Sequence, residues 1–234
     1  MLENITTTQP YLTLLPNNDA VFAPESTFLA KHLLPLVSID LSAVNAEWQG
    51  KIHLINPIEP HDSYIGSYTQ GHHNQYANEN WFILQMDDQN RYQWLGEKDY
   101  FYAEHSDCDA DMKKHSQDMS QDYLALKDRF KETGKLIPTS DIRYKNAEPT
   151  TLLNQLGGET YGGNWLSPID EHFDLQFIHE DTDEQEVHLY DREGHRYYFI
   201  ASASGWEYCL HGADDILMFY QPETKRVLFT FDWT

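Results

Sequence analysis

Histidine, which can bind a metal or transfer a proton near neutral pH, is frequent in this sequence, with 12 copies. His72 and His73 are adjacent in a polar segment and Glu79 follows them, so these three residues are the best metal-ligand candidates. His188 and His195 flank a predicted turn and could approach each other across a hairpin. None of these spacings matches HExxH or CxxC, and exposed loop and strand residues of this kind occur without a metal. We therefore expect no metal and no cofactor, and we keep a small-ligand or metal-dependent enzyme that uses His72, His73 and Glu79 as the alternative.

Motifs for nucleophilic catalysis and nucleotide binding are weak. Ser204 lies outside a GxSxG motif, and Cys209 and His211 share one face only if their segment is extended. The glycine-rich stretch LGGETYGGNW, residues 156–165, lacks the Lys-Ser/Thr pair with which a P-loop holds phosphate. We predict that the protein is not an enzyme.

Charge is the unusual property of this chain. It contains 38 Asp and Glu residues against 16 Lys and Arg residues, a formal net charge of −22. A field of this sign repels phosphate and attracts basic proteins, so we expect no direct binding to nucleic acid or to an anionic membrane. The charges are also segregated. Residues 146–191 contain 11 acidic residues and no Lys or Arg, whereas residues 113–145 contain eight of the 16 basic residues.

The densest acidic stretch is HEDTDEQE, residues 179–186, which has no Lys or Arg to offset it. Close carboxylates repel one another, so the stretch is either a docking surface for a basic partner or a solvated loop with incidental acids. We predict a docking surface, anchored by tyrosines of the hairpin that follows. The predicted partner-binding residues are Glu180, Asp181, Asp183, Glu184, Glu186, Tyr190, Tyr197 and Tyr198.

Hydrophobic periodicity indicates the elements that must position these residues. Apolar side chains recur at helical spacing over residues 107–133, and Gly134 can end that helix in the left-handed conformation. A short helix is predicted over residues 25–34, in PESTFLAKHLLP. Alternating stretches predict about nine strands, and three pairs of them read as hairpins. Those pairs are NWFILQM with RYQWLG, EVHLY with RYYFIA, and ILMFY with RVLFTFDW.

These elements predict an α+β fold, a mostly antiparallel or mixed β-sheet with one long amphipathic helix and one short helix. The stretch YFYAE, residues 100–104, is expected to extend the sheet. Residues 57–80 have no hydrophobic period and are predicted to form a long loop. We expect a single domain over residues 1–234, with 1–145 and 146–234 as candidate sub-lobes.

Three stretches carry a family resemblance: PLVSIDLSAVNAEWQGKIHLI (35–55), LGGETYGGNW (156–165) and ILMFYQPETKRVLFTFDW (216–233). They resemble the YwqG-like family of uncharacterised bacterial proteins, whose members carry an IDLS-like strand, a glycine-rich LGGxPxW stretch and a closing aromatic strand. Gly157 and Gly158 match that pattern, whereas Tyr161 or Gly162 stands where the family usually has proline. The resemblance implies a single mixed domain rich in β-structure and brings no reaction and no catalytic residue.

Together these features predict a non-catalytic acidic interaction protein, most specifically an immunity protein that neutralises a bacterial toxin such as a nuclease. Its carboxylates would occupy the places that substrate phosphates take in a basic cleft. A housekeeping protein whose acidity only keeps it soluble is the remaining alternative. Cys108 and Cys209 form no metal pattern and no signal peptide is evident, so a cytoplasmic location is expected. The chain has no run of about eighteen apolar residues, so we expect no membrane span.

Overall fold

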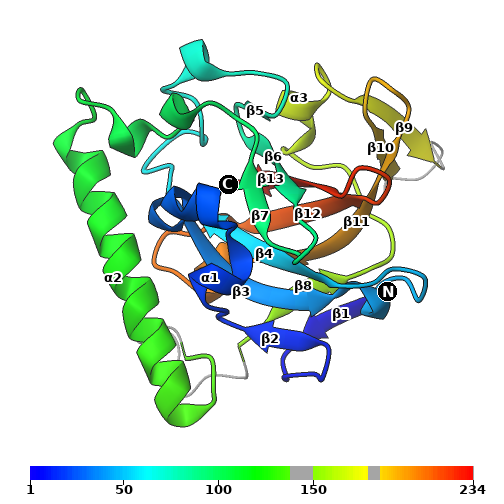
Figure 1. Cartoon of the computed structure of the whole chain (residues 1–234), viewed down its shortest axis with the longest axis horizontal. Coiled ribbons are helices and arrows are strands. Elements are labelled where there is room, and N and C mark those ends of the chain that lie inside the picture. The colour runs from blue at the N-terminus through cyan, green and yellow to red at the C-terminus, as the bar shows by residue number, and fades with distance from the viewer. Residues whose placement is uncertain (138–149, 179–184, 234) are drawn as a thin grey trace.

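The computed structural model describes residues 1–137, 150–178 and 185–233. Within these residues the chain forms two antiparallel sheets and one long helix, which confirms the predicted α+β class (Figure 1). The helices are α1 (Asn18–Val21), α2 (Ala110–Thr133) and α3 (Leu166–Ile169). The 3₁₀ segments are η1 (Pro24–Lys31), η2 (Leu41–Ala43), η3 (Gln70–His72), η4 (Lys98–Tyr100), η5 (Tyr102–Glu104) and η6 (Gly205–Glu207). No helix in the described ranges combines the length and the apolar character that crossing a bilayer requires.

Most strands belong to one antiparallel sheet, which we call the large sheet. Its strands are β1 (Leu2–Ile5), β5 (Ala77–Asn78), β6 (Trp81–Met86), β7 (Tyr92–Trp94), β8 (Leu153–Leu156), β9 (Asp174–Ile178), β10 (Glu186–Tyr190), β11 (Arg196–Ala203), β12 (Asp215–Gln221) and β13 (Arg226–Asp232). The order is β1-β8-β11-β12-β13-β6-β5, with β10 and then β9 added beside β11, and β7 beside β6. Strands of both candidate sub-lobes belong to this one sheet, because β1 pairs with β8 at one side and β6 pairs with β13 at the other.

A second sheet packs over one face of the large sheet. This small sheet consists of β2 (Leu12–Leu14), β3 (Leu33–Asp40) and β4 (Lys51–Pro57), in that order. The main hydrophobic core lies between the two sheets, and the other face of the large sheet carries a second core cluster that includes Trp165 beside α3. In β13, Val227 and Phe229 face the main core while Leu228 faces the second cluster, as the two-residue period of a strand requires. A strand buried on both faces is nearly all apolar, which explains the sequence of β13.

The long helix α2 confirms the strongest local prediction. Asp109 caps its start, because the side chain accepts a hydrogen bond from the backbone N–H of Met112 at 2.7 Å. Gly134 ends it with a φ of 67°, in the left-handed region. The hydroxyl of Tyr123, on the buried face, donates to the carbonyl of Pro35 and so ties α2 to the small sheet. The buried residues of α2 are Met112, His115, Met119, Tyr123 and Leu126.

The short helix predicted over residues 25–34 is present as a 3₁₀ helix, and it ends earlier than predicted. The structure has a 3₁₀ helix, η1, with a break at Ser26, and β3 already begins at Leu33. Pro35 therefore lies inside a strand instead of ending a helix. A register shift between Pro35 and Val37 makes room there for a residue that has no backbone N–H to donate.

Residues 100–104 do not extend the sheet as predicted, and they lie in η4 and η5 instead. The backbone N–H groups of Tyr102 and Ala103 donate to the carboxylate of Glu59 at 3.1 and 3.0 Å, so they are satisfied without a neighbouring strand. Burial raises the pKa of Glu59 to about 7, although those two hydrogen bonds act to lower it. Residues 57–80, predicted as a loop, contain η3 and the two-residue β5 as their regular elements.

Candidate functional site

The side chains of β10 alternate between the second core cluster and a solvent-facing side. Val187 and Leu189 are buried in the cluster. Glu186, His188 and Tyr190 point the other way and are half-buried. This period of two brings a carboxyl and an imidazole onto one face of a single strand.

Strand β11 continues this outer face. Arg196 is paired directly with Tyr190, and its guanidinium lies 4.8 Å from the ring centroid of Tyr198. Tyr198 in turn contacts the ring of Trp48 edge-on, with the centroids 5.4 Å apart. Trp48 lies just before β4 and so marks one end of the small sheet. The outer face lies next to this end, where the small sheet no longer covers the large sheet.

The glycine-rich loop, residues 156–165, adds a second carboxyl to this face. Its first residues run beside β11, where the N–H of Gly157 donates to the carbonyl of Ile200 at 2.7 Å. Further on, the carbonyl of Thr160 accepts from the N–H of Val187 at 2.9 Å, so the loop is fixed to β10. Glu159 lies between these two anchors and is thereby held against the side chains of β10.

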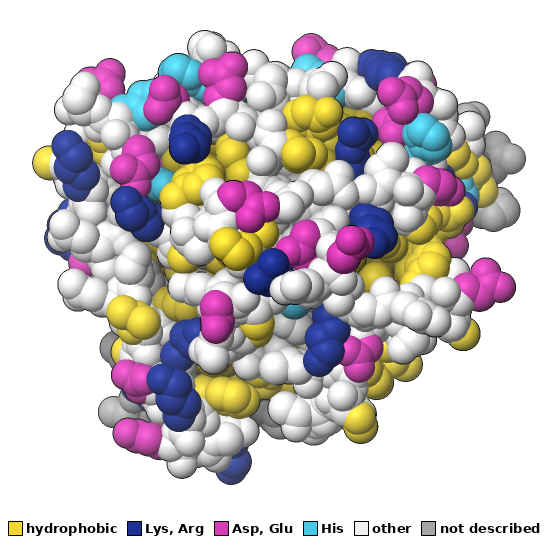
Figure 2. Space-filling model, in the orientation of Figure 1, with side chains coloured by type: hydrophobic (Ala, Val, Ile, Leu, Met, Phe, Trp, Pro, Cys, Tyr) yellow, Lys and Arg dark blue, Asp and Glu magenta, His cyan; other side chains and the backbone are white. Residues whose placement is uncertain are grey.

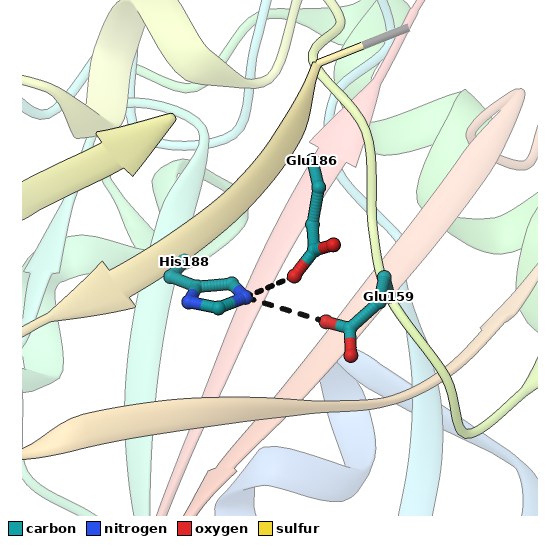
Figure 3. Close-up of side chains that lie close together, drawn as sticks. All are labelled: Glu159, Glu186 and His188. Carbon is teal, nitrogen blue, oxygen red and sulfur yellow. Dashed lines mark hydrogen bonds and ion pairs between the residues drawn. The ribbon is translucent and has the colours of Figure 1, made fainter. Parts of the chain in front are cut away.

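Three side chains meet at this point and form what we call the Glu–Glu–His cluster: Glu159, Glu186 and His188 (Figure 3). Nε2 of His188 pairs with Oε1 of Glu186 and lies 3.5 Å from Oε2 of Glu159. Nη2 of Arg196 lies 3.6 Å from the same Glu159 oxygen. The side chain of Glu159 is 47% exposed, so the cluster is accessible to solvent on the loop side.

The environment of the cluster moves the pKa values of its two carboxyls in opposite directions. Partial burial and then the neighbouring Glu186 raise the pKa of Glu159. Burial acts to raise the pKa of Glu186 too, but hydrogen bonds from Glu159 and His188 outweigh it and lower that pKa. Two carboxylates so close repel each other unless a positive charge lies between them. A cation placed between the two carboxyls would relieve this repulsion.

The ligand atoms of the Glu–Glu–His cluster lie within 4.8 Å of one another, and so do those of Asp191, Glu193 and His195 in the β10–β11 turn. In the turn, however, Asp191 is already engaged, because one of its oxygens accepts the N–H groups of Glu193 and His195 at 3.0 and 2.9 Å. The sequence suggested that His188 and His195 could approach each other. In the structure they belong to these two separate groups.

The structure describes only some of the eight predicted partner-binding residues. Glu180, Asp181, Asp183 and Glu184 lie outside the described residues. Glu186 belongs to the Glu–Glu–His cluster, and Tyr190 and Tyr198 lie on the outer face with it. Tyr197 cannot act as an anchor on this face, because side chains alternate along a strand and that of Tyr197 lies on the opposite face. There it belongs to the second core cluster and is 2% exposed.

The alternative ligand set of His72, His73 and Glu79 is not brought together. Nδ1 of His72 pairs with Glu97 at 3.2 Å, and Nε2 of His73 bonds the carbonyl of Gly66 at 2.9 Å. Glu79 accepts from the hydroxyl of Ser67 at 3.3 Å. Neither of the converging ligand groups found among the described residues includes any of the three.

The charges are segregated along the sequence, but the surface view does not show one uniformly acidic face. On the face shown in Figure 2, acidic and basic side chains are interspersed. Arg192 pairs with Asp174 beside the cluster, and Arg196 lies against Glu159. The outer face of β10 and β11 is therefore a mixed surface with a local pair of carboxyls.

Sequence reasoning missed Glu159 and Arg196 as members of the site. The alternation in EVHLY is a signal that could have joined His188 to Glu186, since positions two apart share a strand face. No local signal exists for Glu159, because its contact with β10 depends on the path of the glycine-rich loop beside β11.

No family model, curated protein or solved structure matches the chain. The resemblance to the YwqG-like family therefore stays a prediction that its three sequence stretches carry.

Proposed function

We propose that this is a non-catalytic acidic interaction protein of the cytoplasm that captures a basic protein, and that it serves as an immunity protein against a bacterial toxin. The observation that carries the proposal is the pair of carboxyls, Glu159 and Glu186, held close together on an accessible face. The overall charge supports it. Even if each of the 16 basic side chains paired with one of the 38 acids, 22 acids would have no Lys or Arg partner.

The carboxyl pair is suited to an arginine or lysine side chain of a partner. A guanidinium or ammonium placed between them can bond both carboxyls in charge-assisted hydrogen bonds. His188 and Arg196 fix the two carboxyls in place from the protein side. Because a cation binds the ionised form of Glu159, capture should become stronger as the pH rises through the raised pKa of Glu159.

Aromatic rings beside the pair supply anchoring area. Tyr190 and Tyr198 lie half-buried on the same face, and the ring of Trp48, just before β4, packs edge-on against Tyr198. Interfaces concentrate their binding energy in such Tyr, Trp and Arg side chains. The net charge of −22 adds long-range attraction that speeds the encounter with a basic cleft.

The test is protection of growing cells. The protein is co-expressed with the product of the reading frame next to its gene, and growth and complex formation are measured. Glu159→Gln together with Glu186→Gln should weaken both at least ~10-fold, because two charge-assisted bonds are lost. Glu193→Gln is the matched control, since Glu193 lies in the turn of the same hairpin and is 75% exposed. If the neighbouring product is harmless, or if the double variant protects as well as the wild type, the proposal fails.

A divalent metal is the second candidate occupant of the Glu–Glu–His cluster, because two carboxylates and one imidazole are a common ligand set for zinc and related ions. That occupant would favour the enzyme alternative. Metal analysis of the purified protein distinguishes the two. Stoichiometric zinc that is lost in His188→Ala would replace the capture proposal, whereas we expect no metal that depends on His188.

A further inference from the structure

A second polar site lies on the other side of the glycine-rich loop. It is a cavity of about 200 Å³ with the carboxyls of Asp215 and Asp232 in its lining. Apolar walls are formed by Trp165, Phe199 and Leu217 from the second core cluster. The loop that places Glu159 on the outer face thus contributes, a few residues later, to a separate cavity on the opposite face of the large sheet.

The two carboxyls occupy directly opposed positions, since Asp215 on β12 and Asp232 on β13 are cross-strand partners. Like charges in this arrangement destabilise a sheet. Asn154 donates to Asp215 at 3.1 Å, and the N–H of Trp233 donates to Asp232 at 3.1 Å, so both receive neutral hydrogen bonds. In the described part of the chain, neither carboxyl has a Lys or Arg within 4 Å.

The loop is shaped around one of these carboxyls. A Cβ at Gly163 would lie 2.7 Å from Oδ2 of Asp232, which is closer than non-bonded atoms approach. Only glycine lets the backbone pass there without displacing the carboxyl. Burial, followed by the charges of Asp232 and Asp214, raises the pKa of Asp215 to about 6, while Asn154 and Ser202 act to lower it. The carboxyl of Asp215 is therefore ionised above about pH 6, and it lies in the cavity without a Lys or Arg counter-charge among the described residues.

We infer that this cavity binds an organic cation, an alkylguanidinium or alkylammonium group, with the charge between Asp215 and Asp232 and the alkyl chain against Trp165 and Phe199. Its volume equals roughly six or seven waters, which is room for the end of an arginine or lysine side chain. Carboxylates hold the charged head, and aromatic faces favour cations. The cation is either a free small molecule or a side chain of a protein partner, and only the second source rests on the proposed function.

The experiment is isothermal titration calorimetry of the full chain at pH 7.5 with n-butylguanidinium and n-butylammonium as probes. We expect a dissociation constant on the order of 1 mM or below for at least one probe. Asp215→Asn and Asp232→Asn should each weaken it at least ~10-fold. Asp99→Asn changes the net charge equally at an exposed residue outside the cavity lining, and it should leave the affinity unchanged. Circular dichroism checks folding, and Asp232→Asn carries the test if Asp215→Asn does not fold.

The neutral analogue N-butylurea decides whether charge is the cause. Equal affinity for N-butylurea, no binding of either cation, or unchanged affinity in Asp232→Asn would each overturn the inference. Acetyl-arginine amide and a Gly-Arg-Gly peptide distinguish the two sources. Binding of these favours a side chain of a partner, and binding of the small probes alone supports a free cation. Both readouts are independent of the growth assay, so this inference and the proposed function can fail separately.

Discussion

The hydroxyl of Tyr92 joins the two sheets, and Tyr92→Phe measures what that junction contributes. Tyr92 lies in β7 of the large sheet and is fully buried. Its hydroxyl accepts from the backbone N–H of His53 at 2.7 Å and donates to the carbonyl of the same residue at 2.6 Å. His53 is in β4, an end strand of the small sheet, so these backbone groups have no strand beyond them to pair with.

The magnitude follows from the two groups that Phe would leave without a partner. Each buried and unsatisfied backbone group costs about 1–3 kcal/mol, so the free energy of unfolding should fall by roughly 2–6 kcal/mol. That is a large part of the roughly 5–15 kcal/mol by which a native domain is stable. Loss of the hydroxyl volume itself adds little, because the phenyl ring remains in place.

Urea denaturation followed by circular dichroism measures the free energy of unfolding. Two other Tyr→Phe variants, with smaller expected losses, serve as comparisons. Tyr208→Phe removes a hydroxyl that makes one buried bond, to the carbonyl of Leu152 at 2.7 Å, and should cost about 1–3 kcal/mol. Tyr161→Phe, at a residue 43% exposed, should stay within about 0.5 kcal/mol. A loss for Tyr92→Phe no larger than that for Tyr208→Phe would refute the reasoning.

Three further outcomes are expected. Burial lowers the pKa of His53 to about 4, so the folded state resists protonation between pH 6.5 and 4 while the unfolded state does not. As the pH falls over that range, the free energy of unfolding of the wild type should therefore decrease by about 3 kcal/mol relative to that of His53→Gln. Urea titrations measure both, and a difference that does not change with pH would contradict the assignment. Asp109→Ala removes the α2 cap and should cost about 1 kcal/mol, against a smaller loss for Asp111→Ala in the first turn, and equal losses would argue against capping. Glu186→Gln should lower the pKa of Glu159 in a carboxyl-carbon NMR titration, and no change would contradict the contribution of Glu186 to that pKa.

Local elements were predictable where one signal acts within a few residues. The hairpins β6–β7, β10–β11 and β12–β13 follow from alternation on both sides of a short turn. The helix α2 follows from its apolar period, with Asp109 and Gly134 at its ends. The helix predicted over residues 25–34 ran too far because β3 begins at Leu33, and the prediction for residues 100–104 was wrong because a distant group decides that segment. Glu59 takes the N–H groups of Tyr102 and Ala103, a contact that no window around residue 100 contains.

The candidate site shows the same limit. Glu186 was singled out for its charge, and its strand position then placed His188 beside it. Glu159 and Arg196 complete the cluster through the glycine-rich loop and the neighbouring strand, and the cavity of Asp215 and Asp232 depends on strand pairing across the sheet. Such long-range pairing is set by how whole faces are buried, and a single sequence does not reveal it.

The position of β13 has a consequence for how the chain must be made. It follows all other strands in the sequence, yet it pairs with β12 on one side and with β6 on the other. Until residues 226–232 leave the ribosome, β6 and β12 expose apolar strand edges with nothing between them. We therefore expect β6 and β12 to join in one sheet only after residues 226–232 are available, and we expect aggregation to be most favoured before this strand inserts.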